Sequence, residues 1–516
     1  MGRHQDRSAR RAERLKGGST VKGFFNKHLG ALLALLIVLT IPVGMVWAKY
    51  AQNLTVTSKL SLTVTAAVTK KYTIDKQKMW KALRTLRDDK PTTLKFVKGN
   101  EVPGDAVRKY ANKGIQADGS GEIGVYFDNN TKIIYIAPVD RNSAVMYAQE
   151  NCSEFLSPSQ TYLYGTVTTV DLGNLDTSNV TDMSSMFYNC YSMTNLDFGN
   201  LDTSKVTDMN NMFYRCYGMT TIDLSSFNTA CVTNMSSMFN GCSGMTTIDL
   251  SKFNTACVTD MSKMFNGCSK LNTLDVTNFD TSEVINMQSM FESCGNITTL
   301  DLSNFNTACV TNMSSMFGYC RKLTSLDLSS FNTACVTKMS SMFEYCENLT
   351  SLDVSSFNTE KVTTMSYMFS YCGSIQEIDL HSFSNKELTD CSYMFEYCRK
   401  VDRIHICGFD SKSRMNITRM FSYLDALYGP THYTYIYAKS GMSIAGSSSD
   451  YSAFHCSAVI GPKGKSNELD SYNNTAKQAP DGYFTACNEH TGSNAKSVTF
   501  DFSGLNNITA VPRGAE

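Results

Sequence analysis

Apolar residues recur along most of the chain with a period of 26 residues. A Met-Phe pair marks each period, and the phrase FNTACVTNMSSMF, which ends on this pair, occurs twice without change, at 227–239 and 305–317. A period of this length predicts a solenoid, in which each coil buries its apolar side only by stacking on its neighbours. The phenylalanines that mark the coils are Phe187, Phe213, Phe239, Phe265, Phe291, Phe317, Phe343, Phe369, Phe395 and Phe421.

Each coil is expected to have two halves. The spacing of Met245, Ile248 and Leu250 predicts a β-strand that directs Ile248 and Leu250 into the core. Asp249, between them, is then exposed on the strand face. The half from 258 to 265 is expected to return on the opposite side as a short strand or a single helical turn. Stacked coils of this kind predict a parallel β-sheet on one face and short turns or helical turns on the other.

The repeated phrases also carry a family resemblance. F-x-x-C-x-x-L-x-x-L-D-L and F-N-T-x-x-V-T-x-M-S-x-M-F resemble the BspA-like leucine-rich repeat surface proteins of bacteria, with 26-residue repeats of Treponema type or mycoplasma lipoprotein type. The resemblance covers roughly residues 150–425, and residues 470–485 resemble the segment that often closes such repeats. It implies a leucine-rich-repeat solenoid of α/β type and a secreted or cell-surface role in adhesion and host interaction.

Residues 49–150 precede the repeats and are predicted to form an N-terminal cap. Asp75 is placed to cap a helix whose apolar side includes Met79 and Leu83. Residues 122–136 have the alternation and the central turn of a β-hairpin. A solenoid needs such an end, because its terminal coil would otherwise expose core and sheet edge.

The first coil and the end of the chain depart from the repeat. The first coil is expected to begin at Cys152 and to contain about six extra residues around 157–162. After the last coil the chain is rich in Ser, Tyr and Gly. The predicted organisation is a basic cytoplasmic segment (1–28), a membrane-directing segment (29–48), an N-terminal cap (49–150), the solenoid (151–428) and a C-terminal cap and tail (429–516).

Residues 29–48 form an uncharged apolar run of twenty residues, LGALLALLIVLTIPVGMVWA. This length is enough for one membrane-spanning helix. Small residues at Val46 and Ala48 also fit a signal peptide that is cleaved after Ala48. Both interpretations send residues 49–516 across the membrane, so we expect a cell-surface or secreted protein that is either anchored by this helix or released.

Charge and motif content exclude several function classes. Residues 29–516 carry 39 basic and 45 acidic side chains. This net charge of −6 argues against nucleic acid as a partner, because phosphate binding needs a clustered basic face. Neither G-x-S-x-G nor H-E-x-x-H occurs, and the seven histidines are scattered. We therefore expect a protein that is not an enzyme and that needs no cofactor.

The chain has 18 cysteines, most of them in ladders with the repeat period. Bridge geometry is strict, and side chains in register point in parallel, so the longer ladder is expected to be reduced, buried core. Disulfides between its rungs are the alternative. Its members are Cys190, Cys216, Cys242, Cys268, Cys294, Cys320, Cys346, Cys372 and Cys398. A second ladder, interrupted at Glu283, consists of Cys231, Cys257, Cys309 and Cys335.

Two further cysteines lie near the C-terminus. Cys456 and Cys487 are expected to form a disulfide that fastens the C-terminal cap. Together with His455 and His490 they offer the alternative of a zinc site, but the spacing matches no known finger. We therefore expect no metal.

An aspartate recurs on the exposed strand face of each coil, and two accounts of this ladder compete. Carboxylates at sheet spacing repel one another, so they need compensation. Hydrogen bonds to flanking hydroxyls such as that of Ser251 would serve the coil itself, whereas a functional ladder would collect calcium or basic groups of a partner. The ladder consists of Asp171, Asp197, Asp223, Asp249, Asp275, Asp301, Asp327, Asp353 and Asp379.

Positions at which the coils differ are the better guide to recognition. Two residues after the Met-Phe pair, the later coils place Tyr319, Tyr345, Tyr371 and Tyr397 in register. Stacked tyrosines serve either as edge packing or as a contact surface for protein or sugar. We expect an adhesin-like protein that binds macromolecules of host or neighbouring cells. The alternatives are an envelope spacer without a ligand and a hydrolase in the C-terminal region.

Overall fold

The computed structural model describes most of the chain after residue 70. The predicted basic segment, the apolar run at 29–48 and its cleavage site all lie outside the described residues. So do Cys456, Cys487 and the histidines beside them. Among the residues that are described, no helix has the length and apolarity needed to cross a membrane. The described residues are 71–424, apart from 111–113, 119, 141–143, 162, 164 and 411, and the segments 434–438, 444–446 and 484–486.

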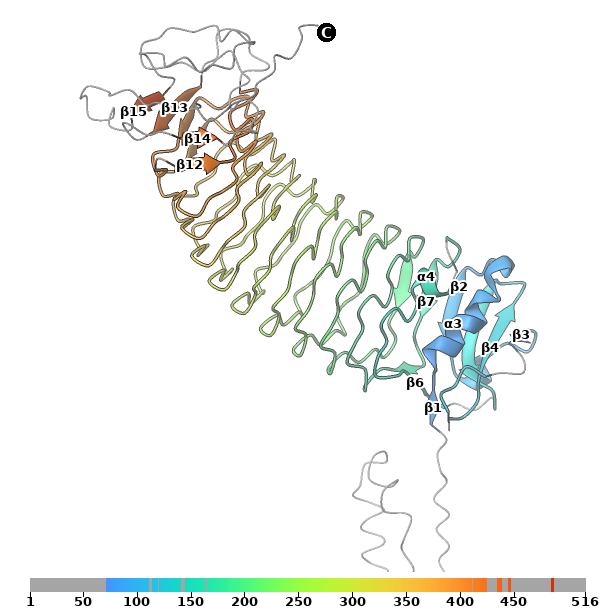
Figure 1. Cartoon of the computed structure of the whole chain (residues 1–516). Helices are drawn as coiled ribbons and strands as arrows, with labels where there is room; N and C mark the ends of the chain where they lie inside the picture. Colours follow the sequence, from blue (N-terminus) through green and yellow to red (C-terminus); the bar gives the residue numbers. More distant parts are fainter. Residues whose placement is uncertain are drawn as a thin grey trace, which may run out of the picture. The chain divides into compact units, whose positions relative to one another are not determined.

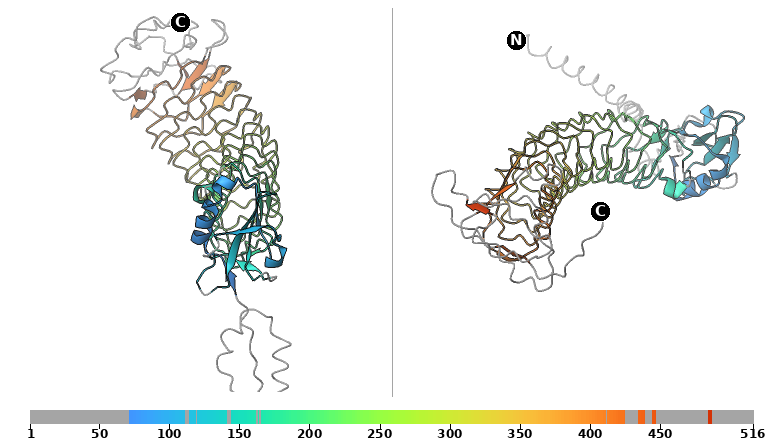
Figure 2. Two further views of the ribbon diagram at one scale, coloured as in Figure 1. Left: turned by 90° about the vertical axis from the view of Figure 1, so that its right-hand side faces the viewer. Right: turned by 90° about the horizontal axis from the view of Figure 1, so that it is seen from above.

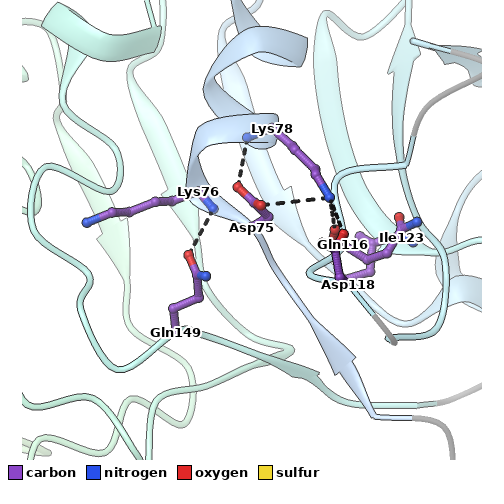
Figure 3. Close-up of polar contacts among 7 residues, drawn as sticks. All are labelled: Asp75, Lys76, Lys78, Gln116, Asp118, Ile123 and Gln149. Atoms are coloured by element: carbon purple, nitrogen blue, oxygen red, sulfur yellow. Dashed lines mark hydrogen bonds and ion pairs between the residues drawn. The ribbon is translucent and has the colours of Figure 1, made fainter.

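The N-terminal cap contains the helix that the sequence predicts. α3 (Lys76–Arg84) begins after Asp75, whose carboxylate accepts a hydrogen bond from the Lys78 amide at 3.0 Å (Figure 3). An acceptor at this position satisfies an amide that the first turn leaves without a partner. The helix buries its apolar side, including Met79 and Leu83. Two short 3₁₀ helices follow, at Arg87–Asp89 and Gly99–Glu101.

A six-stranded sheet joins the cap to the first coils. β4 (Ile123–Asp128) and β5 (Ile133–Pro138) form the predicted antiparallel hairpin. β2 (Thr93–Phe96) lies between β5 and β7 (Thr169–Asp171) and pairs with both in parallel, so the cap sheet continues into the solenoid (Figure 1). β3 (Val107–Lys109) and β9 (Asn195–Asp197) complete the order β3-β4-β5-β2-β7-β9. A second, parallel sheet has the order β1 (Tyr72–Thr73), β6 (Met146–Tyr147) and β8 (Leu175–Asp176).

The first coil contains the expected insertion. Asn151 forms a parallel bridge with Asp182, 31 residues later, whereas the following bridges are 26 residues apart. The extra residues include the short helix α4 (Pro158–Thr161).

The coils stack in sequence order, as the views of Figure 2 show. They enclose a core of repeated apolar side chains. The phenylalanines of the Met-Phe pairs are buried, and their rings stack from coil to coil. The ring centroids of Phe187 and Phe213 are 5.4 Å apart, and those of Phe265 and Phe291 are 6.0 Å apart. The methionine before each phenylalanine is also buried, so each coil covers the apolar side of its neighbours as the period predicts.

The predicted parallel sheet at the Ile248-to-Leu250 positions is wrong for the central coils. On this face the structure has strands only near the two ends of the solenoid, at β7 and β9 and at β10 (Glu377–Asp379) and β11 (Arg403–His405). Between 198 and 376, a stretch that is described throughout, there is no strand. The continuous ladder of parallel bridges instead follows the return half, from Asp182 to Asn416.

Sparse backbone pairing accompanies this difference. At the start of the predicted strand the amide of Thr246 donates to the carbonyl oxygen of Thr220 at 3.0 Å, and the amide of Asn272 donates to that of Thr246 at 3.4 Å. A parallel strand needs evenly spaced hydrogen bonds along its length, and a single bond between two coils does not provide them.

Near the C-terminus the parallel pairing resumes. β13 (Tyr435–Ala438) and β15 (Phe484–Ala486) extend the sheet in the order β10-β11-β13-β15. β12 (Lys412–Met415) pairs in parallel with β14 (Ile444–Gly446). The strands described beyond residue 428 therefore continue the stacking of the coils.

Candidate binding surface

Most coils turn at three aspartate or asparagine residues, and Lys338, Thr364 and Ser384 are exceptions. In one coil these are Asp249, Asn254 and Asp260, whose side-chain oxygens accept hydrogen bonds from the amide two residues later at 2.9, 3.1 and 2.8 Å. Such Asx turns let a short side chain replace a backbone acceptor. The polar residues that recur in every coil therefore shape the backbone.

A buried threonine binds each coil to the next. The hydroxyl of Thr333 donates to the carbonyl oxygen of Asn358 at 2.9 Å and accepts from the amide of Asn358 at 2.7 Å. At the last such position the residue is Asn385, whose side-chain amide donates to the carbonyl of Asp410 at 2.7 Å and accepts from its amide at 3.0 Å. The ladder therefore requires a donor and an acceptor rather than one residue type.

The longer cysteine ladder is buried and free of disulfides, as predicted. The thiol of Cys242 donates to the carbonyl oxygen of Phe213 at 3.1 Å, and burial raises the pKa of this thiol to about 12. In the second ladder, Cys231, Cys257 and Cys309 are exposed free thiols. Cys407, which belongs to neither ladder, is disulfide-bonded.

The aspartate ladder is exposed, and its carboxylates are used within their own coils. Asp249 accepts hydrogen bonds from Ser251, and these bonds hold its pKa below the ordinary value although Asp223 repels it. The same cause lowers the pKa of the other central rungs. This arrangement favours the structural account, in which the aspartates stabilise their own coils rather than bind a ligand. The rungs with a lowered pKa are Asp223, Asp249, Asp275, Asp301, Asp327 and Asp353.

The remaining rungs make similar contacts. Asp171, Asp197 and Asp379 accept from the amides of Gly173, Gly199 and His381. Asp171 also lies 3.7 Å from the ammonium of Lys95 in the cap. Over the part of the chain that the structure describes, no group of three or more His, Cys, Asp or Glu side chains is arranged to hold a metal ion.

The four predicted tyrosines stack into one strip, which the structure extends to Tyr423. The ring centroids of Tyr319, Tyr345, Tyr371, Tyr397 and Tyr423 are 4.5, 4.1, 4.4 and 4.4 Å apart in turn. All five side chains are half-buried. Tyr423 occurs in the sequence at the same offset from Phe421, so this signal was present. Because each ring face covers the next, the strip presents ring edges and hydroxyls.

The backbone of this tyrosine strip is strained. Its residues have φ between 57° and 60°, in the left-handed region that disfavours side chains with a Cβ. At the equivalent position two other coils carry Gly241 and Gly267, which adopt this region freely. A tyrosine here costs about 1–2 kcal/mol relative to glycine, so tyrosine is not the residue that the turn itself favours.

A second pair of tyrosines and two glutamates lie beside the strip, and the sequence prediction missed them. Tyr367 and Tyr393 stack at 4.5 Å, two residues before their coil phenylalanines. Glu344 and Glu396 come one residue after the coil phenylalanines, and burial raises the pKa of both carboxyls. Ser370 holds the same position in the coil between them. Polar groups are thus partly enclosed between two aromatic columns.

A smaller aromatic cluster occurs in the first coils. Tyr188 stacks on Tyr214 at 4.7 Å, and Tyr191 stacks on Tyr217 at 5.3 Å. The Arg215 guanidinium lies 5.1 Å from the Tyr214 ring centre. This cluster spans two coils, whereas the strip spans five, so the strip is the larger candidate surface.

Comparisons with known proteins identify the repeats. The model of a family described as "Mycoplasma protein of unknown function, DUF285" matches residues 159–272, 242–334 and 319–431, which together are more than half of the chain. No curated protein matches the sequence. Among solved structures, the functional domain of InlJ from Listeria monocytogenes, whose title states that it includes a cysteine ladder, is similar with 16% identity and a TM-score of 0.18. The match covers 50% of this chain and 63% of that chain.

Proposed function

The chain belongs to the DUF285 family, and we propose that it is an exported, surface-associated repeat protein that binds a macromolecular partner through its C-terminal coils. The repeat phrases that resemble BspA-like leucine-rich repeat proteins support this role, as does the apolar run at 29–48. The proposal includes neither catalysis nor a cofactor.

The strained tyrosine strip is the observation that carries this proposal. Ladders that serve the coil, such as the buried threonines, are present in almost every coil. The strip instead occupies only the last five coils described, at a backbone conformation that glycine adopts at lower cost. The left-handed conformation itself belongs to the fold, since Asn189, Arg215 and Ser293 adopt it at the same position of other coils. The turn does not explain why five successive coils place tyrosine there, and half-buried tyrosines are preferred contact residues in protein interfaces.

The stacking geometry favours a protein over a glycan as the ligand. Sugar rings pack on exposed aromatic faces, but each inner ring of the strip has both faces covered by its neighbours, as Tyr371 has between Tyr345 and Tyr397. The accessible edges carry partial positive charge, so they complement carbonyl oxygens. A polypeptide backbone supplies such oxygens at regular intervals.

A binding comparison tests this function. The full chain, solubilised in mild detergent, would be applied to purified extracellular matrix glycoproteins and to an array of cell-surface glycans. The strip variant carries Tyr345→Ser, Tyr371→Ser and Tyr397→Ser, and the control variant carries Tyr188→Ser, Tyr191→Ser and Tyr217→Ser in the first coils. Circular dichroism establishes that both variants are folded.

We expect the unaltered chain and the control variant to bind at least one matrix protein and the strip variant to lose this binding. Equal binding by the strip variant would remove the contact role of the tyrosines. If the unaltered chain binds nothing, the role of an envelope spacer replaces the proposal. The uniform hydrogen-bond ladders of the coils are the observation that favours this second candidate.

A further inference from the structure

Glu344 is a half-buried carboxylate to which the described residues supply no ion pair. Its hydrogen-bonding neighbour is the hydroxyl of Ser341, and burial is the main cause that raises its pKa. An enclosed carboxylate is stabilised by a cation or by several hydrogen bonds. The Glu344 carboxylate can therefore accept hydrogen bonds from a positively charged group in addition to the bond from Ser341.

An equivalent glutamate two coils later has an arginine partner. Glu396 lies 3.8 Å from the guanidinium of Arg419, which is also 5.9 Å from the centre of the Tyr393 ring. Arg419 is 23 residues after Glu396, and the residue 23 after Glu344 is Tyr367. Tyr367 therefore occupies, relative to Glu344, the position that Arg419 occupies relative to Glu396. The protein itself shows how a cation is held between a glutamate and a tyrosine at this surface.

Ser370 is the small residue that holds the position of the two glutamates in the intervening coil. This serine lies in the coil between Glu344 and Glu396, is fully buried, and its hydroxyl has no hydrogen-bond partner. The charges of the two glutamates interact across that coil, which places them on the same side. Ser422, at the same position in the coil after that of Glu396, is also fully buried and without a hydrogen-bond partner although Arg419 lies beside Glu396. A cation at this surface therefore contacts the glutamate and not the serine.

The coil of Tyr371 lacks a side chain at a position where two other coils carry an arginine. Four residues after the coil phenylalanine, two coils carry arginines: Arg321 lies over the ring of Tyr345 at 5.3 Å, and Arg399 lies over Tyr397 at 5.1 Å. In the coil of Tyr371 this position is Gly373, where an added Cβ would meet nothing within 4 Å. Arginines of the protein thus contact the rings on either side, whereas the coil of Tyr371 has a glycine.

We propose that Glu344, Tyr367 and Tyr371 form a site for an arginine or lysine side chain of a partner polypeptide. The carboxylate of Glu344 would receive the charged N–H groups, and the tyrosines would flank the cation as Tyr393 flanks Arg419. This inference rests on the proposed function and names the chemistry that the strip region selects in its ligand.

The test uses fluorescently labelled hexa-arginine as the probe and hexa-citrulline as its neutral counterpart. Binding to the full chain in detergent is measured by fluorescence anisotropy at low salt. Glu344→Gln removes the carboxylate, and Tyr367→Arg supplies the guanidinium that Glu396 already has. The residue equivalent to Tyr367 is Arg419 with φ 50°, so the fold accepts arginine at this backbone position. Glu360→Gln, at an exposed turn, changes the net charge by the same amount and is the control.

We expect Glu344→Gln and Tyr367→Arg each to raise the Kd for hexa-arginine at least about tenfold, which is the size expected for losing one charge-assisted hydrogen bond. Glu360→Gln should change it by less than about twofold, and hexa-citrulline should not bind. Equal Kd values for Glu344→Gln and Glu360→Gln would overturn the site, as would an unaltered chain that ignores hexa-arginine. If matrix-protein binding still depends on the tyrosine strip in that case, the proposed function remains and only this cation site is refuted.

Discussion

Thr229 and Asn254 lie on successive coils and exchange two hydrogen bonds through a single hydroxyl. The Thr229 hydroxyl donates to the carbonyl oxygen of Asn254 at 2.8 Å, and the amide of Asn254 donates to the same hydroxyl at 2.8 Å. Thr229 is almost completely buried. The buried hydroxyl thus fixes the register of the two coils.

Thr229→Val should lower the free energy of unfolding by about 1–3 kcal/mol, because it removes both hydrogen bonds to the backbone of Asn254. Thr229→Ser keeps the hydroxyl and should lose less than about 1.5 kcal/mol, mainly for the methyl group. Urea unfolding followed by circular dichroism measures both. A valine variant as stable as the serine variant would show that the hydroxyl does not fix the register.

The two cysteine ladders should differ in reactivity. A thiolate is the reactive form, and burial raises the pKa of Cys242 and of Cys320 to about 12. In the native protein at pH 8, iodoacetamide should therefore modify the exposed Cys231, Cys257 and Cys309, whereas the longer ladder should react only after denaturation. Peptide mass spectrometry locates the modified residues. Modification of Cys242 in the native protein would contradict the buried ladder.

The aspartate ladder should make the fold sensitive to acid. Hydrogen bonds from the residue two positions later hold the pKa of Asp223 and Asp249 below the ordinary value of 3.8. A carboxyl whose pKa is lower in the folded state stabilises the fold above its unfolded pKa, and this contribution is lost as the pH falls through the folded pKa. The urea midpoint should therefore decrease as the pH is lowered below about 4.

The double variant Asp223→Asn, Asp249→Asn should show a weaker dependence on pH. Asparagine makes the same turn, as Asn228 and Asn254 do, but it has no proton to gain in this range. Asp105→Asn, at an exposed position of the cap, is the matched control and should follow the unaltered protein. The comparison requires urea midpoints from pH 5 to pH 2, and equal slopes for the two variants would refute the role of the ladder.

Tyr371 should contribute little to stability in spite of its two stacked neighbours. Its φ of 59° costs about 1–2 kcal/mol, and asparagine tolerates this region better. Tyr371→Asn relieves this backbone strain but loses the two ring contacts, each worth about 0.5–1.5 kcal/mol. Because the two effects oppose each other, the free energy of unfolding should change by less than about 1 kcal/mol. Tyr371→Ala loses the contacts without comparable relief and should be less stable. Equal thermal unfolding of the two variants would argue against backbone strain.

The features that were predictable from the sequence depend on position within the period. Phe239 and Cys242 recur in register, and repeated apolar residues can be satisfied only in a shared core, where both are buried. The helix after Asp75 follows from a local capping rule in the same way. These predictions required no knowledge of the distance between coils.

The strand at Ile248 to Leu250 depended on how the backbones of successive coils pair, and its prediction was wrong in the central coils. Alternation specifies which side chains face the core, but it does not specify backbone pairing. The hydrogen bond between Thr246 and Thr220 is not continued along Ile248 to Leu250 as sheet pairing requires. The alternation of glutamate and serine at Glu344 and Ser370 was visible in the sequence, but the tight turn that brings them beside Tyr367 was not.

Because the same threonine bonds join successive coils, the number of coils can change without a change in the structure of each coil. Excision of residues 227–304 would join Ser226 directly to Phe305, within an unchanged FNTACVTNMSSMF. The hydroxyl of Thr203, which now bonds the backbone of Asn228, would meet the same groups of Asn306. The number of coils, and with it the reach between the cap and the tyrosine strip, can therefore change by whole repeats while each junction keeps its bonds.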